Sequence, residues 1–185
     1  MIKQALVALT KDLVVGVPTD TVYGLAVNAY SESALDRLFE VKGRPADRPI
    51  AVLVSGIEQA QKVVEFNPKA RELAERYWPG PLTLVLRKSS GVPEHIGNPA
   101  NRTVGVRMPK HQVALQILAD GGPLLVSSAN RSGQAPAVDS IAAQEMFGEE
   151  VAFYLPGAAG AGESSTVVDL SGTEPVILRA GPVKI

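Results

Sequence analysis

The sequence predicts an α/β fold of the α+β kind, in which a twisted mixed sheet is flanked by helices. Apolar runs typical of strands alternate with amphipathic segments in the first part of the chain, whereas three short strands cluster near its C-terminus, at 151–155, 166–170 and 175–179. The 185 residues show no repeat, low-complexity tract or linker, and we expect one domain over 1–185.

Helices are predicted where apolar residues recur every three or four positions next to a capping residue. In the segment 32–42, Leu35, Leu38 and Val41 share one face, and Ser31 or Ser33 lies near its start. Helices are expected at 2–10, 32–42, 57–65, 68–77, 111–119 and 138–147. Further strands are expected at 12–18, 50–55, 82–87, 103–108 and 124–126. The turn Pro79-Gly80-Pro81 ends the fourth helix.

Composition excludes several classes of protein. Lys and Arg number 18 against 19 Asp and Glu, so no global basic excess indicates nucleic-acid binding, although a local basic cleft stays open. The chain has no cysteine, which removes disulfides, thiolate metal sites and a cysteine nucleophile, and fits a reducing cytoplasm. No apolar run is long enough to span a bilayer, so no membrane contact is expected.

The most informative segment is Pro18-Thr19-Asp20-Thr21-Val22-Tyr23-Gly24, which follows an apolar run ending at Val17. Ligands of α/β proteins usually bind beyond the carboxyl ends of strands. Thr19, Thr21 and Tyr23 supply hydroxyls there, and we expect Asp20 to stabilise the turn rather than to hold a metal. Taken alone, the segment fits a ligand-binding loop and a polar turn between a strand and a helix equally well.

Two further polar clusters follow predicted elements. Lys42-Gly43-Arg44 closes a helix, where cations suit the helix dipole, but Arg and Lys there also suit a phosphate. The segment 127–133, rich in Ser and Asn, follows a buried strand and is either an anion nest or a common turn. No Walker loop, Gly-x-Gly-x-x-Gly or Gly-x-Ser-x-Gly element occurs, which argues against dinucleotide binding and serine hydrolysis.

Together these blocks resemble the YrdC/TsaC family of L-threonylcarbamoyladenylate synthases. The matching blocks run in the family's order from about residue 13 to 181: Pro18-Thr19-Asp20-Thr21-Val22-Tyr23-Gly24, Lys42-x-Arg44, Trp78-Pro79-Gly80-Pro81-Leu82-Thr83, Val106-Arg107-Met108-Pro109, Ser128-Ala129-Asn130-x-Ser132-Gly133, Ser164-Ser165-Thr166-Val167-Val168-Asp169 and Leu178-Arg179-x-Gly181. The chain is most similar to the short bacterial form.

The resemblance implies a YrdC-like fold with a large concave, electropositive cavity. It implies a nucleotidyltransferase that joins L-threonine, bicarbonate or CO2, and ATP into threonylcarbamoyl-AMP and releases pyrophosphate, with Mg²⁺ expected on the phosphates. The product would serve the threonylcarbamoyladenosine modification of tRNA beside the anticodon, through downstream tRNA threonylcarbamoyl-transfer proteins, in the cytoplasm. A protein-held metal site is not implied.

The resemblance also implies site residues, position by position. The catalytic tetrad would be Lys42, Arg44, Ser128 and Asn130. Threonine would be held by Thr21, Tyr23, Arg107, Ser127 and Ser165. ATP would be held by Lys42, Arg44, Arg48, Ala129 through its backbone, Asn130 and Arg179. One departure is Leu53, which stands where some members carry a histidine.

Two questions stay open at this point. The labile carbamate needs shelter from water, and either of two glycine-bearing stretches, 88–101 or 156–165, is expected to close over the site. The alternative function is a module that binds tRNA or duplex RNA without synthase activity, because the family's basic concave face also suits a duplex. A purely RNA-binding role would not need hydroxyls around a carboxylate clamp.

Overall fold

The computed structural model describes residues 1–43, 49–160 and 162–185. Arg44 and Arg48 therefore lie outside the described residues. The helices are α1 (Ile2–Leu9), α2 (Glu32–Lys42), α3 (Ile57–Gln61), α4 (Pro68–Tyr77), α5 (Gln112–Gly121), α6 (Ser140–Phe147) and the 3-10 helix η1 (Gly148–Glu150). The strands are β1 (Val15–Val17), β2 (Gly24–Asn28), β3 (Ala51–Leu53), β4 (Leu82–Arg87), β5 (Thr103–Arg107), β6 (Leu124–Ser128), β7 (Phe153–Tyr154), β8 (Thr166–Asp169) and β9 (Val176–Arg179).

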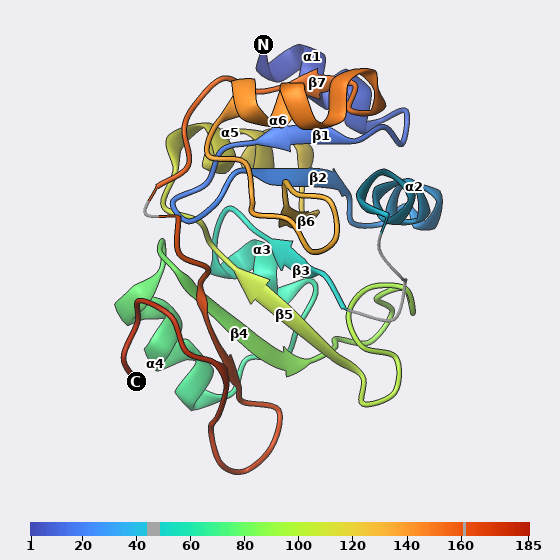
Figure 1. The fold of residues 1–185 in the computed structure, drawn as a ribbon. Helices are drawn as coiled ribbons and strands as arrows, with labels where there is room; N and C mark the ends of the chain where they lie inside the picture. The colour runs from blue at the N-terminus through green and yellow to red at the C-terminus, as the bar shows by residue number, and fades with distance from the viewer. Residues whose placement is uncertain (44–48, 161) are drawn as a thin grey trace.

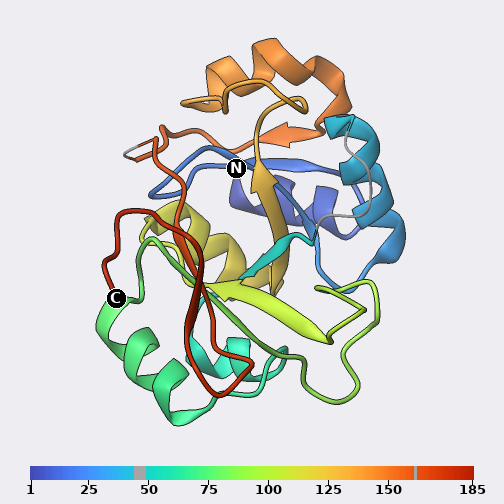
Figure 2. The ribbon, with the colours of Figure 1, turned by 60° about the horizontal axis from the view of Figure 1, so that its bottom comes forward.

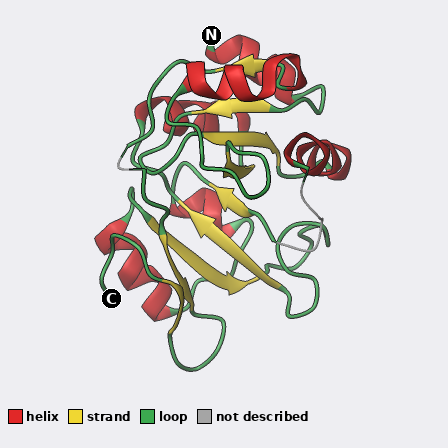
Figure 3. Ribbon diagram, in the orientation of Figure 1, coloured by secondary structure: helices red, strands yellow, loops and turns green. Residues whose placement is uncertain are grey.

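The nine strands form one mixed sheet in the order β7-β1-β2-β6-β3-β5-β4-β8-β9. The pairs β1·β7, β3·β5 and β4·β8 are parallel, and the other neighbouring pairs are antiparallel. The strands turn steadily from β1 and β2 to β4 and β5, and the helices lie around them (Figures 1 and 3). The prediction of a twisted mixed sheet flanked by helices is confirmed.

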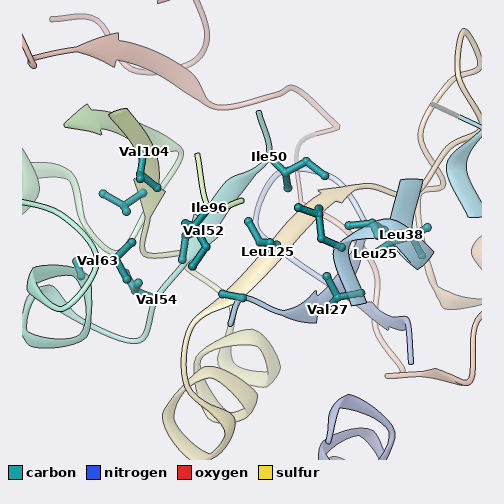
Figure 4. Close-up of a cluster of buried hydrophobic side chains, with 14 of the residues drawn as sticks. Leu25, Val27, Leu38, Ile50, Val52, Val54, Val63, Ile96, Val104 and Leu125 are labelled. Atoms are coloured by element: carbon teal, nitrogen blue, oxygen red, sulfur yellow. The ribbon is translucent and has the colours of Figure 1, made fainter. Parts of the chain in front are cut away.

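Two apolar clusters hold the helices against the sheet. One joins α1 and α5 to one part of the sheet through residues such as Leu9, Ile117 and Leu124. The larger one contains α2, α3, α4 and α6, and Figure 4 shows Leu38 of α2 beside Leu25 of β2. In Figures 1 and 2, α6 lies near the β7 edge and α4 lies beside β4. These contacts hold the helices against the sheet, and the sheet carries the residues of the candidate site described below.

Local chemistry sets the ends of the predicted helices. The Ser31 hydroxyl accepts the Ala34 N–H at 3.2 Å to begin α2, and Gly43 ends it with a left-handed φ of 58°. Asn67 caps α4 through the Ala70 N–H at 2.8 Å. These caps place Lys42 in the last turn of α2.

Two segments of the chain differ from the prediction. The segment Gly24–Asn28 was not predicted as a strand, but it forms β2 and pairs with β1 and β6. The polar segment 18–23 is therefore the connection of a β-hairpin rather than of a strand and a helix. The helix expected over 57–65 ends at Gln61, because Val64 turns away to pair with Lys88.

Candidate active site

The hairpin connection between β1 and β2 is held by its own threonines. The Thr19 hydroxyl donates to the Val22 carbonyl at 2.7 Å and accepts the Thr21 N–H at 3.2 Å. The two threonine hydroxyls lie 3.0 Å apart, and both side chains are buried. These hydrogen bonds hold the connection in one conformation, in which the Thr21 hydroxyl can also bond to residues outside the connection.

A cavity of about 430 Å³ opens beside this connection. Its volume lies in the range of small-molecule sites. Its polar lining residues are Thr19, Thr21, Thr83, Asn98, Asn101, Thr103, Arg107, Ser127, Ser128, Ser164, Ser165, Asp169 and Arg179. Its apolar lining includes Val22, Ile50, Leu53, Val85, Val126, Val167 and Leu178. Thr21, Arg107, Ser127, Ser128, Ser165 and Arg179 were expected at the site from the sequence.

Arg107 lies at the end of β5 and is only 6% exposed. Its Nε donates to the Gly80 carbonyl at 3.0 Å, Nη1 donates to the Thr21 hydroxyl at 2.8 Å, and Nη2 forms an ion pair with Asp20. Burial lowers the pKa of the guanidinium, while the Asp20 carboxylate raises it, and arginine keeps its charge. Among the described residues, one N–H on each terminal nitrogen remains for a ligand.

A second arginine reaches the same cavity from β9. Arg179 Nε donates to the Ser165 carbonyl at 2.9 Å, and Nη2 donates to the Ser165 hydroxyl at 3.1 Å. That hydroxyl also lies 2.8 Å from the Thr83 hydroxyl. Arg179 lies close enough to Arg107 to lower the pKa of the Arg107 guanidinium. The cavity therefore holds two positive charges and a chain of hydroxyls.

The three described residues of the expected tetrad come together at the end of β6. Lys42 is 3% exposed, and its ammonium donates to the Ser128 carbonyl and, at 2.9 Å, to the Asn130 carbonyl. The Ser128 hydroxyl donates to Asn130 Oδ1, and Asn130 Nδ2 donates to the Gln134 carbonyl at 3.0 Å. Lys42 thus fixes the loop after β6 and brings positive charge near Ser128, which lines the cavity.

Ala129 and Tyr23 lie differently from what the resemblance implies. The Ala129 N–H donates to the Tyr23 carbonyl at 2.8 Å, and the Ala129 carbonyl accepts the Ala137 N–H at 2.8 Å, so its backbone groups are paired within the protein. Tyr23 is fully buried in the larger apolar cluster, and its hydroxyl donates to the Leu155 carbonyl at 2.7 Å. The expectation that Tyr23 lines the pocket is corrected, because its ring joins β2 to the segment after β7.

This placement predicts the effect of Tyr23→Phe. The substitution removes a buried hydrogen bond and leaves the Leu155 carbonyl without that donor, which should lower the free energy of unfolding by about 1–2 kcal/mol. The KM for threonine, the substrate that the family resemblance implies, should stay unchanged, since the hydroxyl does not reach the cavity. Denaturant unfolding and steady-state kinetics test both halves, and a raised KM without a loss of stability would return Tyr23 to the site.

Several residues that line the cavity were not named as site residues in the sequence analysis. Thr83 and Asp169 each end a family motif given there, and that position could have indicated them. Asn98 and Asn101 come from the stretch 88–101, which was considered only as a closing loop. There the buried Lys88 ammonium donates to the Pro93 and Glu94 carbonyls at 3.1 Å each, and burial lowers the pKa of that ammonium. These bonds fold the stretch back onto its own first residue, directly after β4, and Asn98 and Asn101 form part of the cavity wall.

The other glycine-bearing stretch, 156–165, lies against the β1–β2 connection. The Gly160 N–H donates to the Thr19 carbonyl at 3.0 Å, and the Gly162 N–H donates to the Thr21 carbonyl at 2.9 Å. A Cβ at Gly160 would lie 2.1 Å from the Asp20 carbonyl oxygen, so only glycine fits this approach. This contact fixes the connection from its outer side.

Neither a metal cluster nor a membrane span is found in the described parts of the chain. Residues 1–43, 49–160 and 162–185 contain no group of three or more His, Asp or Glu that could hold a metal ion. Across the same ranges, no helix is long and apolar enough to cross a bilayer.

The geometry is that of an α/β protein with a cavity whose charge suits small anionic molecules. A buried arginine with two N–H groups not bonded to described residues suits a carboxylate, whereas an exposed arginine beside Ser165 suits phosphate. Both lie in one cavity, so two different anions can be brought together there.

The comparisons with known proteins agree with this class. A sequence profile of the Sua5/YciO/YrdC family, described as "Telomere recombination", matches residues 7–181. A relative from Mycobacterium tuberculosis is 42% identical over 98% of this chain and 84% of its own. The threonylcarbamoyl-AMP synthase of Pyrococcus abyssi is 43% identical over 90% of this chain and 50% of its own. The crystal structure of P. abyssi Sua5 complexed with L-threonine matches with a TM-score of 0.91 and 40% identity, over 97% of this chain and 54% of that one.

This chain belongs to the Sua5/YciO/YrdC family, as the sequence motifs predict. It spans about half the length of the Pyrococcus proteins that it matches.

Proposed function

We propose that this chain is an L-threonylcarbamoyladenylate synthase and a nucleotidyltransferase. The observation that carries the proposal is the Arg107 fork, which lies in one cavity with Arg179 and the hydroxyls of Thr21 and Ser165. The relatives named threonylcarbamoyl-AMP synthase, and the Pyrococcus structure with L-threonine, support the same activity. They lend no support to the alternative of an RNA-binding module without synthase activity.

Threonine is placed at the buried end of the cavity. Its carboxylate takes the two remaining N–H groups of Arg107, as a bidentate pair. The hydroxyls of Thr21, Ser127 and Ser165 bind its amino and hydroxyl groups, and the apolar lining near Leu53 and Val126 receives its methyl group. One methyl group discriminates threonine from serine by only about 1–3 kcal/mol.

ATP is placed beside Ser128 and Arg179, which line the cavity, with Asn130 bonded to Ser128 and Lys42 behind that loop. Arg44 and Arg48, which lie outside the described residues, are proposed to bind the phosphates as the family resemblance implies. Mg²⁺ would neutralise phosphate charge when bound. The chain's own cations reduce the repulsion between the two anionic substrates.

The reaction then needs two bonds to form. The threonine amine attacks CO2, which forms a C–N bond and releases a proton to give the carbamate; bicarbonate supplies CO2 by losing hydroxide. A carbamate oxygen next attacks the α-phosphorus of ATP in line, and the bond to pyrophosphate breaks. Catalysis rests on positioning and charge, since the mechanism needs no covalent intermediate with the enzyme. The product would pass to tRNA threonylcarbamoyl-transfer proteins in the cytoplasm.

The test is pyrophosphate release from ATP, with L-threonine, bicarbonate and Mg²⁺ omitted one at a time. We expect release to require both threonine and bicarbonate, and mass spectrometry to detect threonylcarbamoyl-AMP. Release that is independent of threonine would contradict the proposal. So would a folded chain that binds duplex RNA but releases no pyrophosphate.

A further inference from the structure

Asp20 is the acidic residue that touches the cavity's buried arginine. Its Oδ1 pairs with Arg107 Nη2, and its side chain is 13% exposed. Its other oxygen, Oδ2, is buried and has no hydrogen-bond partner among the described residues. A buried carboxylate with an unpaired oxygen carries a cost in stability, so its presence beside a binding site calls for a reason.

Asp20 stands behind Arg107 rather than in the cavity. Thr19 and Thr21 line the cavity, whereas Asp20 does not. On its other side, the Asp20 backbone is covered by Gly160. Asp20 also lies near His111, where burial lowers the pKa of the imidazole although the Asp20 charge opposes that shift, and no ion pair joins the two among the described residues. Within the described residues, Arg107 is therefore the cation that balances the Asp20 charge.

The second arginine of the cavity has no such counter-ion. In the part of the chain that the structure describes, Arg179 donates only to the carbonyl and the hydroxyl of Ser165, which are neutral. Among the described residues, no carboxylate lies within ion-pair distance of Arg179. The two arginines share one cavity, which Asp169 also lines, yet of the two only Arg107 is paired directly with a carboxylate of the described residues.

From this asymmetry we infer that Asp20 is a positioning residue that reserves Arg107 for the carboxylate of the amino acid and keeps polyphosphate away from it. The inference rests on the proposed function. A polyphosphate gains most from an unbalanced cation, because the attraction grows with the charge on each partner. Asp20 reduces that attraction at Arg107 and leaves it intact at Arg179. At the same time, Asp20 holds the guanidinium so that its two remaining N–H groups suit the planar fork of a carboxylate.

Asp20→Asn tests the inference, because the amide keeps an acceptor for Arg107 and loses only the charge. The dissociation constant of L-threonine is measured by calorimetry with and without inorganic pyrophosphate. In the parent chain, we expect pyrophosphate to leave threonine binding unchanged. In Asp20→Asn, pyrophosphate should reach Arg107 and weaken threonine binding about tenfold. In the kinetic assay, the KM for threonine should then rise with ATP concentration only in this variant.

The control is Asp36→Asn on α2, an exposed position that undergoes the same change of charge. It should behave as the parent chain does, and thermal unfolding shows that each variant is folded. Equal insensitivity to pyrophosphate in Asp20→Asn and the parent would overturn the inference. It would also be overturned if Asp20→Asn bound threonine weakly without pyrophosphate and pyrophosphate caused no further loss, since Asp20 would then hold the guanidinium without keeping polyphosphate away from it. Failure of the parent chain to bind threonine at all would instead overturn the proposed function.

Discussion

Arg107→Ala is expected to suppress threonine-dependent pyrophosphate release strongly while ATP still binds. The substitution removes a buried, charge-assisted pair with the substrate carboxylate, whose loss costs about 2–5 kcal/mol and should lower kcat/KM for threonine by roughly 30-fold to several thousand-fold. It also leaves Asp20 buried without its cation. Steady-state kinetics with threonine as the varied substrate, together with calorimetry of ATP binding, measure the two effects separately.

Arg107→Lys tests whether threonine use needs only a positive charge at this position or also the planar guanidinium. Lysine keeps a positive charge but cannot offer the planar fork, so most of the loss in threonine use should remain. Arg37→Ala, at an exposed position of α2, is the matched control and should keep the parent's kinetics. A threonine KM in Arg107→Ala equal to that of the parent would remove Arg107 from the carboxylate site.

Lys42→Met should lower both stability and turnover. Methionine fills a similar volume but cannot donate to the Ser128 and Asn130 carbonyls, which lose a charged donor. We expect the free energy of unfolding to fall by about 2–4 kcal/mol. We expect kcat to fall by roughly 100-fold or more, because the loop after β6 and its positive charge are both disturbed. Denaturant unfolding and initial rates at saturating substrates provide the measurements.

The control for this variant is Lys69→Met on the surface of α4. Lys69 pairs with Glu72 at 3.0 Å, but both side chains are about half exposed, so the pair should contribute little. Lys42→Met with the stability and turnover of Lys69→Met would show that Lys42 has no part in holding the loop.

Elements that are determined by residues close together in the sequence could be predicted from the sequence alone. The Ser31 cap, the apolar face of 32–42 and the glycine after Lys42 predict α2 with its observed bounds. The turn Pro79-Gly80-Pro81 predicted the end of α4, and the structure adds that Asn67 caps its start. The motif blocks predicted Thr21, Arg107, Ser127, Ser128, Ser165 and Arg179, which the fold brings to one cavity.

Features that depend on distant strands could not be predicted from the sequence. Gly24–Asn28 is short and follows a polar turn, and it becomes a strand only because β1 and β6 flank it. The motif that contains Tyr23 predicted a pocket residue, but its hydroxyl donates to the Leu155 carbonyl, 132 positions further along the chain. The Gly80 carbonyl became a partner of Arg107 only through the pairing of β4 with β5. No local pattern records such contacts.

The parallel pairing of β4 with β8 determines when the binding site can form during synthesis of the protein. It sets Thr83 beside Val167 and brings Ser165 and Arg179 to a cavity whose other walls are made by residues 19 to 128. During synthesis, the early strands leave the ribosome long before their last neighbours. The binding site therefore cannot exist on the growing chain until its final segments have emerged, and substrate capture begins only after translation of this region is essentially complete.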